Sequence, residues 1–342
     1  MDYEAWDKDY QENKEAYLKI FDKVMSQSNI EDCSALEAKI PNSVAVASAT
    51  DALQFSLQAY NIGPGDEVLV SNFSWISTAS CISIVGATPV FCDIDDDYHI
   101  SLDSMKRMIS SKTKALVYTH LFGNMSDMTD IIEFCKVNNI ILIEDAAQSY
   151  GSSLNGVAAG TIGDISSFSF NSNKVISGIN GGGVVITKDK TDIIQKLRRH
   201  GNGEMLGRNS KMYRLNSEII AYRLEKEKEY KLRRQLIADK YHDWLMDQCV
   251  VQGVKPGLVH NYHKYVIRVE NESIRNSILT HTKAKVHYPI VLSDNKCFHS
   301  NMRQDHTPKA EEVTKTVISL PIHPWVTDNE IDDLCGKIEM LL

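Results

Sequence analysis

Four short segments of the chain carry residue types that could do chemistry on a bound cofactor. The segment SFSFNSNK, residues 167–174, places a lysine in a polar loop of small residues that follows a predicted strand. A lysine partly removed from water has a lowered pKa, and its neutral amine can form a Schiff base with a carbonyl group. Lys174 is therefore a candidate nucleophile, although a solvated surface lysine is the more common occupant of such a position.

The segment ILIEDAAQ, residues 141–148, ends an apolar strand with two acidic residues. α/β sheets bind their ligands at the carboxyl ends of such strands. A carboxylate held there, such as that of Asp145, could pair with a protonated ring nitrogen and keep the ring charged. The alternative interpretation is a helix cap or a surface acid.

Two further segments could hold the rest of a planar phosphorylated ligand. SATDAL, residues 48–53, lies at a predicted strand-to-helix junction, where free backbone N–H groups and the hydroxyl of Thr50 could bind phosphate. A simple helix cap is the alternative. In NFSWIST, residues 72–78, Trp75 could stack on a flat cofactor, and core packing is the alternative.

Strands and helices alternate through the part of the chain that must position these segments. Short, largely apolar strands of this kind are typical of a sheet covered on both faces, and their alternation with helices predicts a mostly parallel α/β sheet. The predicted strands cover residues 43–49, 67–71, 89–92, 115–119, 140–144, 165–170 and 183–187, and the predicted helices cover residues 51–60, 77–85, 102–109 and 128–137.

The two ends of the chain differ from this region. Residues 1–39 predict an amphipathic helical arm, because apolar residues recur there at helical spacing. Residues 223–234 are densely charged, which indicates a solvated helix face, and they begin a long helix that runs towards Cys249 and suits a domain linker. Short strands at 264–269 and 285–288 and a final helix from Asp328 predict a smaller α+β domain. The expected division is therefore 1–39, a large domain at 40–222, and 223–342.

Composition excludes several classes of function. The 342 residues are 43% hydrophobic and 24% charged, with a formal net charge of -8 and no long Lys/Arg block, which argues against nucleic acid as a partner. The seven cysteines show no CxxC spacing, so they indicate no zinc site and fit a reducing cytoplasm. The acidic N-terminus is no signal peptide, and no apolar run approaches the roughly 18 residues that a membrane span needs.

Taken in order, the motifs resemble those of the DegT/StrS-type nucleotide-sugar aminotransferases, which are fold-type-I pyridoxal-phosphate enzymes. The resemblance runs from about residue 30 to the C-terminus. It implies a large domain with a mostly parallel seven-stranded sheet between helices, a smaller C-terminal α+β domain, and a homodimer with active sites at the subunit interface. The motifs that carry it are ASATDAL, GPGDEV, FSWIST, GATPVFCDID, THLFGN, ILIEDAAQSYG, GDISSFSFNSNK with the glycine run and VVIT, LRRHG, VHYP and SLPIHP.

The resemblance also implies roles for individual residues around pyridoxal 5'-phosphate. Relatives often have an asparagine where this chain has Met212, so Arg214 or Asn216 is expected to reach the phosphate of the partner subunit instead. The implied roles are the internal aldimine for Lys174, the ring nitrogen for Asp145, the ring hydroxyl for Gln148, ring stacking for Trp75, phosphate binding for Thr50, Ser169 and the backbone N–H of Asp51, and the sugar pocket for His200, His287 and Tyr288. Structural hydrogen bonding is the alternative for the last three.

The implied activity is transfer of an amino group from an amino acid, glutamate in the usual case, to a keto sugar linked to a nucleotide diphosphate. The kinetics would be ping-pong, and the pathway polysaccharide biosynthesis. One alternative is a pyridoxamine-dependent sugar dehydratase, in which a histidine replaces the lysine, so Lys174 argues against it. The other is a non-catalytic regulatory relative, against which Lys174, Asp145 and Gln148 argue together.

Overall fold

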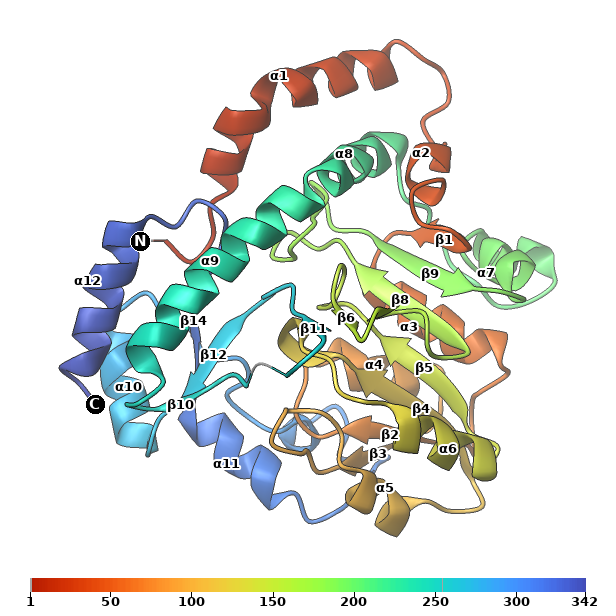
Figure 1. Ribbon diagram of the computed structural model, residues 1–342. Coiled ribbons are helices and arrows are strands. Elements are labelled where there is room, and N and C mark those ends of the chain that lie inside the picture. The colour runs from red at the N-terminus through yellow and green to blue at the C-terminus, as the bar shows by residue number, and fades with distance from the viewer. Residues whose placement is uncertain (1, 254) are drawn as a thin grey trace.

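The computed structural model describes residues 2–253 and 255–342, and its centre is an eight-stranded sheet (Figure 1). The strands β13, β3, β2, β4, β5 and β8 pair in parallel, whereas β9 is antiparallel to both β8 and β1. In spatial order the strands are β1 (Ser43–Val46), β9 (Gly183–Thr187), β8 (Ile165–Ser169), β5 (Ile141–Asp145), β4 (Thr113–Thr119), β2 (Glu67–Ser71), β3 (Thr88–Cys92) and β13 (Arg303–Gln304).

Helices cover both faces of this sheet, as the apolar strands require. Successive side chains of a strand point to opposite faces. Val68 and Val70 of β2 therefore pack against α3 (Ala49–Ala59), α4 (Ser77–Ile84) and α7 (Thr191–Leu197), and Leu69 packs towards α5 (Leu102–Met108) and α6 (Thr129–Val137). The two apolar layers hold the sheet rigid between them.

The C-terminal region has its own core around a second, antiparallel sheet. This sheet contains β10 (Val250–Val251), β12 (Tyr265–Arg268) and β14 (Val317–Leu320). It packs against α9 (Glu227–Leu245), α10 (Glu272–His281) and α12 (Asp328–Glu339), with α11 (Pro308–Thr316) leading into β14. The helices α8 (Arg214–Glu225) and α9 run in succession from the large sheet to this region (Figure 1). A small third sheet joins β11 (Leu258–Val259), β6 (Ser153–Leu154) and β7 (Val157–Ala158).

The N-terminal arm consists of α1 (Trp6–Met25) and α2 (Ser34–Glu37), as the helical spacing predicts. A buried ion pair between Asp9 and Arg223 fastens α1 to α8, and the Arg223 guanidinium also donates to the hydroxyl of Tyr17 at 2.8 Å. The N-terminus lies beside the C-terminal region, where the backbone oxygen of Asp2 is 3.0 Å from a ring nitrogen of His323 (Figure 1).

Three expectations differ from the structure. The sheet has eight strands rather than seven, because Arg303–Gln304 of the C-terminal region adds a short edge strand to β3. The charged segment predicts one helix from Arg223, whereas the structure has two successive helices, α8 and α9, because buried apolar residues such as Ile219 and Ile220 already form a helix before the charged segment; the expected boundary at 222/223 therefore falls inside α8. Residues 285–288 form no strand; Lys285 alone pairs, with Ser319, and the chain then turns towards the cavity described below.

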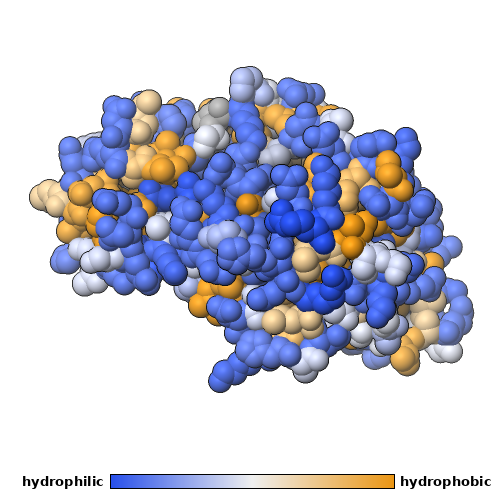
Figure 2. All heavy atoms as spheres, turned by 90° about the horizontal axis from the view of Figure 1, so that it is seen from below, coloured by the Kyte–Doolittle hydropathy of each residue, from blue (hydrophilic) through white to orange (hydrophobic). Residues whose placement is uncertain are grey.

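The molecular surface is largely polar on the face seen in Figure 2. Hydrophilic side chains predominate on the face shown in Figure 2, and hydrophobic ones form separate patches. Within residues 2–253 and 255–342, no helix combines the length and the apolar character that a transmembrane crossing requires.

Candidate active site

A cavity of about 530 Å³ opens at the edge of the large sheet where the parallel strands end. β1 runs in the same direction as β8, so the segments after β1, β2, β5 and β8 all reach this edge. The sheet thereby brings together most of the residues that the sequence indicates. Among those predicted, Thr50, Trp75, Asp145, Gln148, Ser169, Lys174, His287 and Tyr288 line the cavity.

Lys174 and Asp145 both line this cavity and affect each other's ionisation. Burial lowers the pKa of Lys174 to about 8, and the negative charge of Asp145 acts in the opposite direction. Burial raises the pKa of Asp145, while hydrogen bonds and the charge of Lys174 counteract that effect. The bonds come from the Thr78 hydroxyl at 2.8 Å and the Ala147 backbone N–H at 3.2 Å. The site therefore combines an amine that is easily made neutral with a carboxylate that donors hold in place.

The amino end of α3 forms the second part of the cavity. The Ser48 side chain caps this helix by accepting a hydrogen bond from the backbone N–H of Asp51, and Thr50 donates to Ser77 at 2.9 Å. A side chain at Gly183 would collide with backbone atoms of Ser48 and Ala49, so only glycine lets β9 approach the helix so closely. Hydroxyls gathered at a helix amino end suit an anion such as phosphate.

Aromatic and amide groups form a third wall. The Gln148 amide accepts from the backbone N–H of Phe122 at 2.9 Å and donates to the Tyr288 hydroxyl at 3.1 Å. The ring of Trp75 is 6.0 Å from that of Tyr288 and is 56% exposed, so it is not a core residue. His287 is 2.9 Å from the Ser319 hydroxyl, and burial lowers its pKa to about 3, so its ring is neutral.

Asp51 and His200 lie outside the lining of this cavity. The carboxylate of Asp51 accepts from Arg208 and Ser210, both at 2.8 Å, and its backbone N–H is taken by the Ser48 cap. His200 is exposed on the short helix His200–Gly203, and its backbone N–H donates to the Arg208 carbonyl at 3.1 Å.

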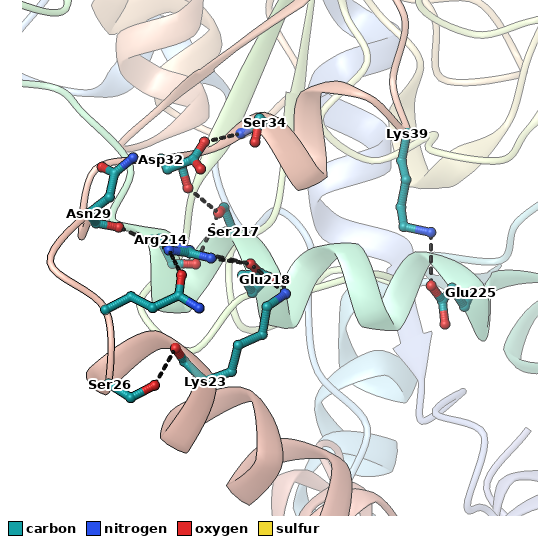
Figure 3. A network of polar contacts seen from close by, with 11 residues as sticks. Lys23, Ser26, Asn29, Asp32, Ser34, Lys39, Arg214, Ser217, Glu218 and Glu225 are labelled. Atoms are coloured by element: carbon teal, nitrogen blue, oxygen red, sulfur yellow. Dashed lines mark hydrogen bonds and ion pairs between the residues drawn. The ribbon is translucent and has the colours of Figure 1, made fainter.

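The side chains of Arg214 and Asn216 form hydrogen bonds within their own chain. Figure 3 shows the Arg214 guanidinium turned towards the N-terminal arm, where it donates to Gln27 at 2.7 Å and approaches Glu218 at 3.3 Å. Asn216 holds the glycine loop that lines the cavity, since its amide accepts from the Ile179 N–H at 2.8 Å and donates to the Gly181 carbonyl at 2.7 Å. Met212 is buried in the apolar core.

Thr78, His263 and Lys264 are among the lining residues that the sequence does not single out. Thr78, in the FSWIST segment, donates a hydrogen bond to Asp145. His263 and Lys264 come from the C-terminal region, where the sequence predicts only that a strand begins at Lys264. No sequence signal marks these two residues, because they are 89 and 90 positions from Lys174 and only the fold brings them to it.

Comparison with known proteins identifies a family that matches most of the chain. A family model described as the DegT/DnrJ/EryC1/StrS aminotransferase family matches residues 31–339. The chain is 33% identical over 329 residues to a UDP-N-acetyl-3-dehydro-alpha-D-glucosamine 3-aminotransferase of Acidithiobacillus ferrooxidans, over 90% of this chain and 88% of the relative. It is 30% identical over 351 residues to a GDP-perosamine synthase of Escherichia coli O157:H7, over 98% and 93% of the two chains.

Solved structures agree at the level of the fold. A DegT/DnrJ/EryC1/StrS aminotransferase from Brucella abortus superimposes with a TM-score of 0.93 at 24% identity and covers 99% of both chains. The fold, the site and the matched family thus define the class of this protein, which is an aminotransferase. Within that class, the chain belongs to the DegT/DnrJ/EryC1/StrS aminotransferase family.

Proposed function

We propose that this chain is a pyridoxal-phosphate-dependent aminotransferase that moves an amino group from an amino acid, glutamate in the first instance, to a keto sugar linked to a nucleotide diphosphate. The observation that carries the proposal is that Lys174 and Asp145 share one cavity, with the pKa of the lysine lowered by burial. The two relatives described above are named for amino sugars attached to UDP and GDP, which supports the substrate class.

The chemistry of the cavity residues fits pyridoxal phosphate. Lys174 supplies an amine for the aldehyde, Asp145 a carboxylate for the ring nitrogen, and Thr50 and Ser169 hydroxyls beside a helix amino end for the phosphate. Gln148 and Trp75 are proposed to contact the ring hydroxyl and the ring face. When bound, the cofactor supplies the electron-withdrawing ring that stabilises negative charge on the carbon undergoing proton transfer. A neighbour from Streptococcus pneumoniae, 25% identical, is described as a PLP form, and this also supports the cofactor.

Different cavity residues are proposed to have different roles in the reaction. Lys174, with a pKa of about 8, has a much larger neutral fraction near neutral pH than an ordinary lysine, so its amine can bind the aldehyde and, once displaced, accept and return a proton. Asp145 keeps the ring nitrogen protonated through its negative charge. His287 and Tyr288 are proposed to orient the sugar. Because one cavity serves both substrates in turn, we expect ping-pong kinetics.

We further propose a cytoplasmic homodimer with sites at the subunit interface. Exposed apolar side chains near the cavity and the arm, such as Ile179 and Tyr213, support an interface on this side. Sedimentation equilibrium should give twice the chain mass of 38.5 kDa. A fully active monomer would refute this part.

A visible absorption spectrum of the purified holoenzyme tests the proposal. We expect a coloured form that glutamate bleaches and that the keto-sugar substrate restores. Lys174→Ala should remove the band and turnover while the far-ultraviolet circular dichroism stays unchanged, whereas Lys188→Ala, at an exposed lysine that directly follows β9, should change neither. Near-normal turnover in Lys174→Ala would disprove the role of this lysine.

The same experiment distinguishes the aminotransferase from a non-catalytic regulatory protein and from a sugar dehydratase. A relative from Geobacillus stearothermophilus, 28% identical, is named a pleiotropic regulatory protein, so a regulatory role has a specific precedent. A bound cofactor that does not respond to any amino acid would favour that role. A cofactor that supports loss of water from the sugar without amino transfer would favour a dehydratase.

A further inference from the structure

Two buried cations beside the cavity have no acidic partner. Lys264, immediately before β12, is 6% exposed, and Arg234 of α9 is 8% exposed. Arg234 donates to the carbonyl oxygens of Tyr262 at 3.0 Å and Ile322 at 2.8 Å, and its Nε has no partner. Within residues 2–253 and 255–342, neither cation has a carboxylate oxygen within 4 Å. A buried charge without a counter-ion is costly, so this arrangement favours the binding of an anion.

The first described residues, 2–6, form a strap over these cations. The ring centre of Tyr3 is 4.8 Å from Nζ of Lys264 and 4.5 Å from Nζ of Lys285. A hydrogen bond at Trp6 holds the other end of the strap in place. The Trp6 Nε1 donates to the backbone oxygen of Ser172 at 3.1 Å, and Ser172 is two residues before Lys174. The aromatic face of Tyr3 compensates the lysines only in part, because a cation–π contact is weaker than an ion pair in a buried site.

A cavity of about 70 Å³ lies beneath the strap and adjoins the main one. Lys174, His263 and Lys264 line both, and Arg234 lines the smaller. This volume holds a few water-sized groups, which matches a carboxylate. The charges that act on Lys264 come from three cations, namely Lys174, Arg234 and Lys285, and from one acid, the exposed Glu4. Burial, followed by these cations, lowers the pKa of Lys264 to about 7, and an anion would restore its charge.

We propose that Lys264 and Arg234 form a carboxylate subsite, which receives a carboxylate carried into the cavity by a substrate. The inference rests on the proposed function. Lys264 offers three N–H donors, and the Arg234 guanidinium retains donors that the two carbonyls do not use. The carboxylate has two possible sources, the amino donor or an acidic keto sugar, since both substrates occupy the same cavity in turn. The binding chemistry is the same for either source.

The test uses the cofactor-loaded enzyme and three variants. Lys264→Met removes the charge with little change of shape, and Lys264→Arg retains it. Lys285→Met is the matched control, because it removes a charge from the same Tyr3 ring but lies outside the lining of both cavities. Glutarate, a dicarboxylate without an amino group, serves as the probe in isothermal titration calorimetry. Thermal melts confirm that each variant is folded.

We expect Lys264→Met to raise the glutarate Kd about tenfold or more, as loss of a buried charge-assisted hydrogen bond does, with Lys264→Arg and Lys285→Met close to the wild type. Steady-state kinetics, with each substrate varied in turn, then identify the source. A higher KM with little change in kcat for glutamate identifies the donor, and the same change for an acidic but not a neutral keto sugar identifies the sugar. Unchanged glutarate binding in Lys264→Met, or an equal loss in Lys285→Met, would overturn the subsite. A wild type that binds glutarate but never transfers an amino group would instead disprove the proposed function.

Discussion

The hydrogen bond from Thr78 to Asp145 offers a direct test of what sets the pKa of Asp145. Thr78 is 1% exposed, and its hydroxyl lies 2.8 Å from one carboxylate oxygen. It is the strongest of the influences that oppose the effect of burial on the pKa of Asp145. Thr78→Val replaces the hydroxyl by a methyl group of nearly the same size, so it removes the donor without opening a cavity.

The size of the effect follows from the charge on the acceptor. A hydrogen bond to a charged group contributes about 1.5 to 3 kcal/mol. Since every 1.4 kcal/mol is tenfold, its loss disfavours the ionised carboxyl by roughly 10- to 100-fold. The pKa of Asp145, already raised by burial, rises further in the variant. Because the carboxylate is the active form, the acid limb of the activity profile must move to higher pH.

The assay is the pH dependence of kcat/KM, which reports ionisations of the free enzyme. We expect Thr78→Val to lose about 10- to 100-fold of its activity on the acid side and to regain part of it as the pH rises. Thr78→Ser keeps the hydroxyl and is the control, with an acid limb close to that of the wild type. An unchanged acid limb in Thr78→Val would refute the argument that this hydroxyl controls the ionisation of Asp145.

Three further predictions concern other residues. Asp145→Asn should lower turnover by about two orders of magnitude or more while cofactor binding, measured by absorbance, persists, because the amide carries no negative charge; a loss of only a few-fold would reduce Asp145 to a structural role. Glu144→Gln should lower the free energy of unfolding at neutral pH by about 3 to 5 kcal/mol. Although Glu144 is buried, His120 and the N–H groups of residues 160, 162 and 163 hold its pKa below its ordinary value. Its contribution is therefore present at neutral pH and is lost on acidification. The free energy of unfolding in urea should fall less between neutral and acid pH in the variant than in the wild type. Parallel pH curves for the two proteins would contradict this. Arg214→Ala should lower the melting temperature and leave kcat within about two-fold, because its partners Gln27 and Glu218 lie in the arm and in α8 of the same chain; an inactive variant that regains activity in mixed dimers with Lys174→Ala would instead show that Arg214 serves the partner subunit.

The local pattern of the sequence was sufficient for most of the elements and brought most of the predicted site residues into the cavity lining. Alternating apolar strands and helices predict a parallel sheet, and parallel strands must present their carboxyl ends at one edge. Residues that follow those ends, such as Trp75, Asp145 and Lys174, therefore meet there. The assignment of the family also followed from ordered motifs, and it is confirmed by the match over residues 31–339.

Tertiary structure alone decided which side chains are free to act. The side chains of Asp51 and Arg214 form contacts with distant residues of the same chain, such as Arg208 for Asp51 and Gln27 for Arg214. No local pattern reports such contacts, because hydrogen-bond satisfaction depends on segments more than 150 positions away.

The sequence by itself determined the class of fold, the family, and the lysine and acid at the strand ends, because these depend on local periodicity and on short motifs. The tertiary structure decided the tuning of those groups. The depth of burial that lowers the pKa of Lys174, the Thr78 donor to Asp145, and the approach of Lys264 and Arg234 beneath Tyr3 all arise from packing between remote elements. Desolvation and charge act through space over a few ångströms, so they become defined only when the chain has folded.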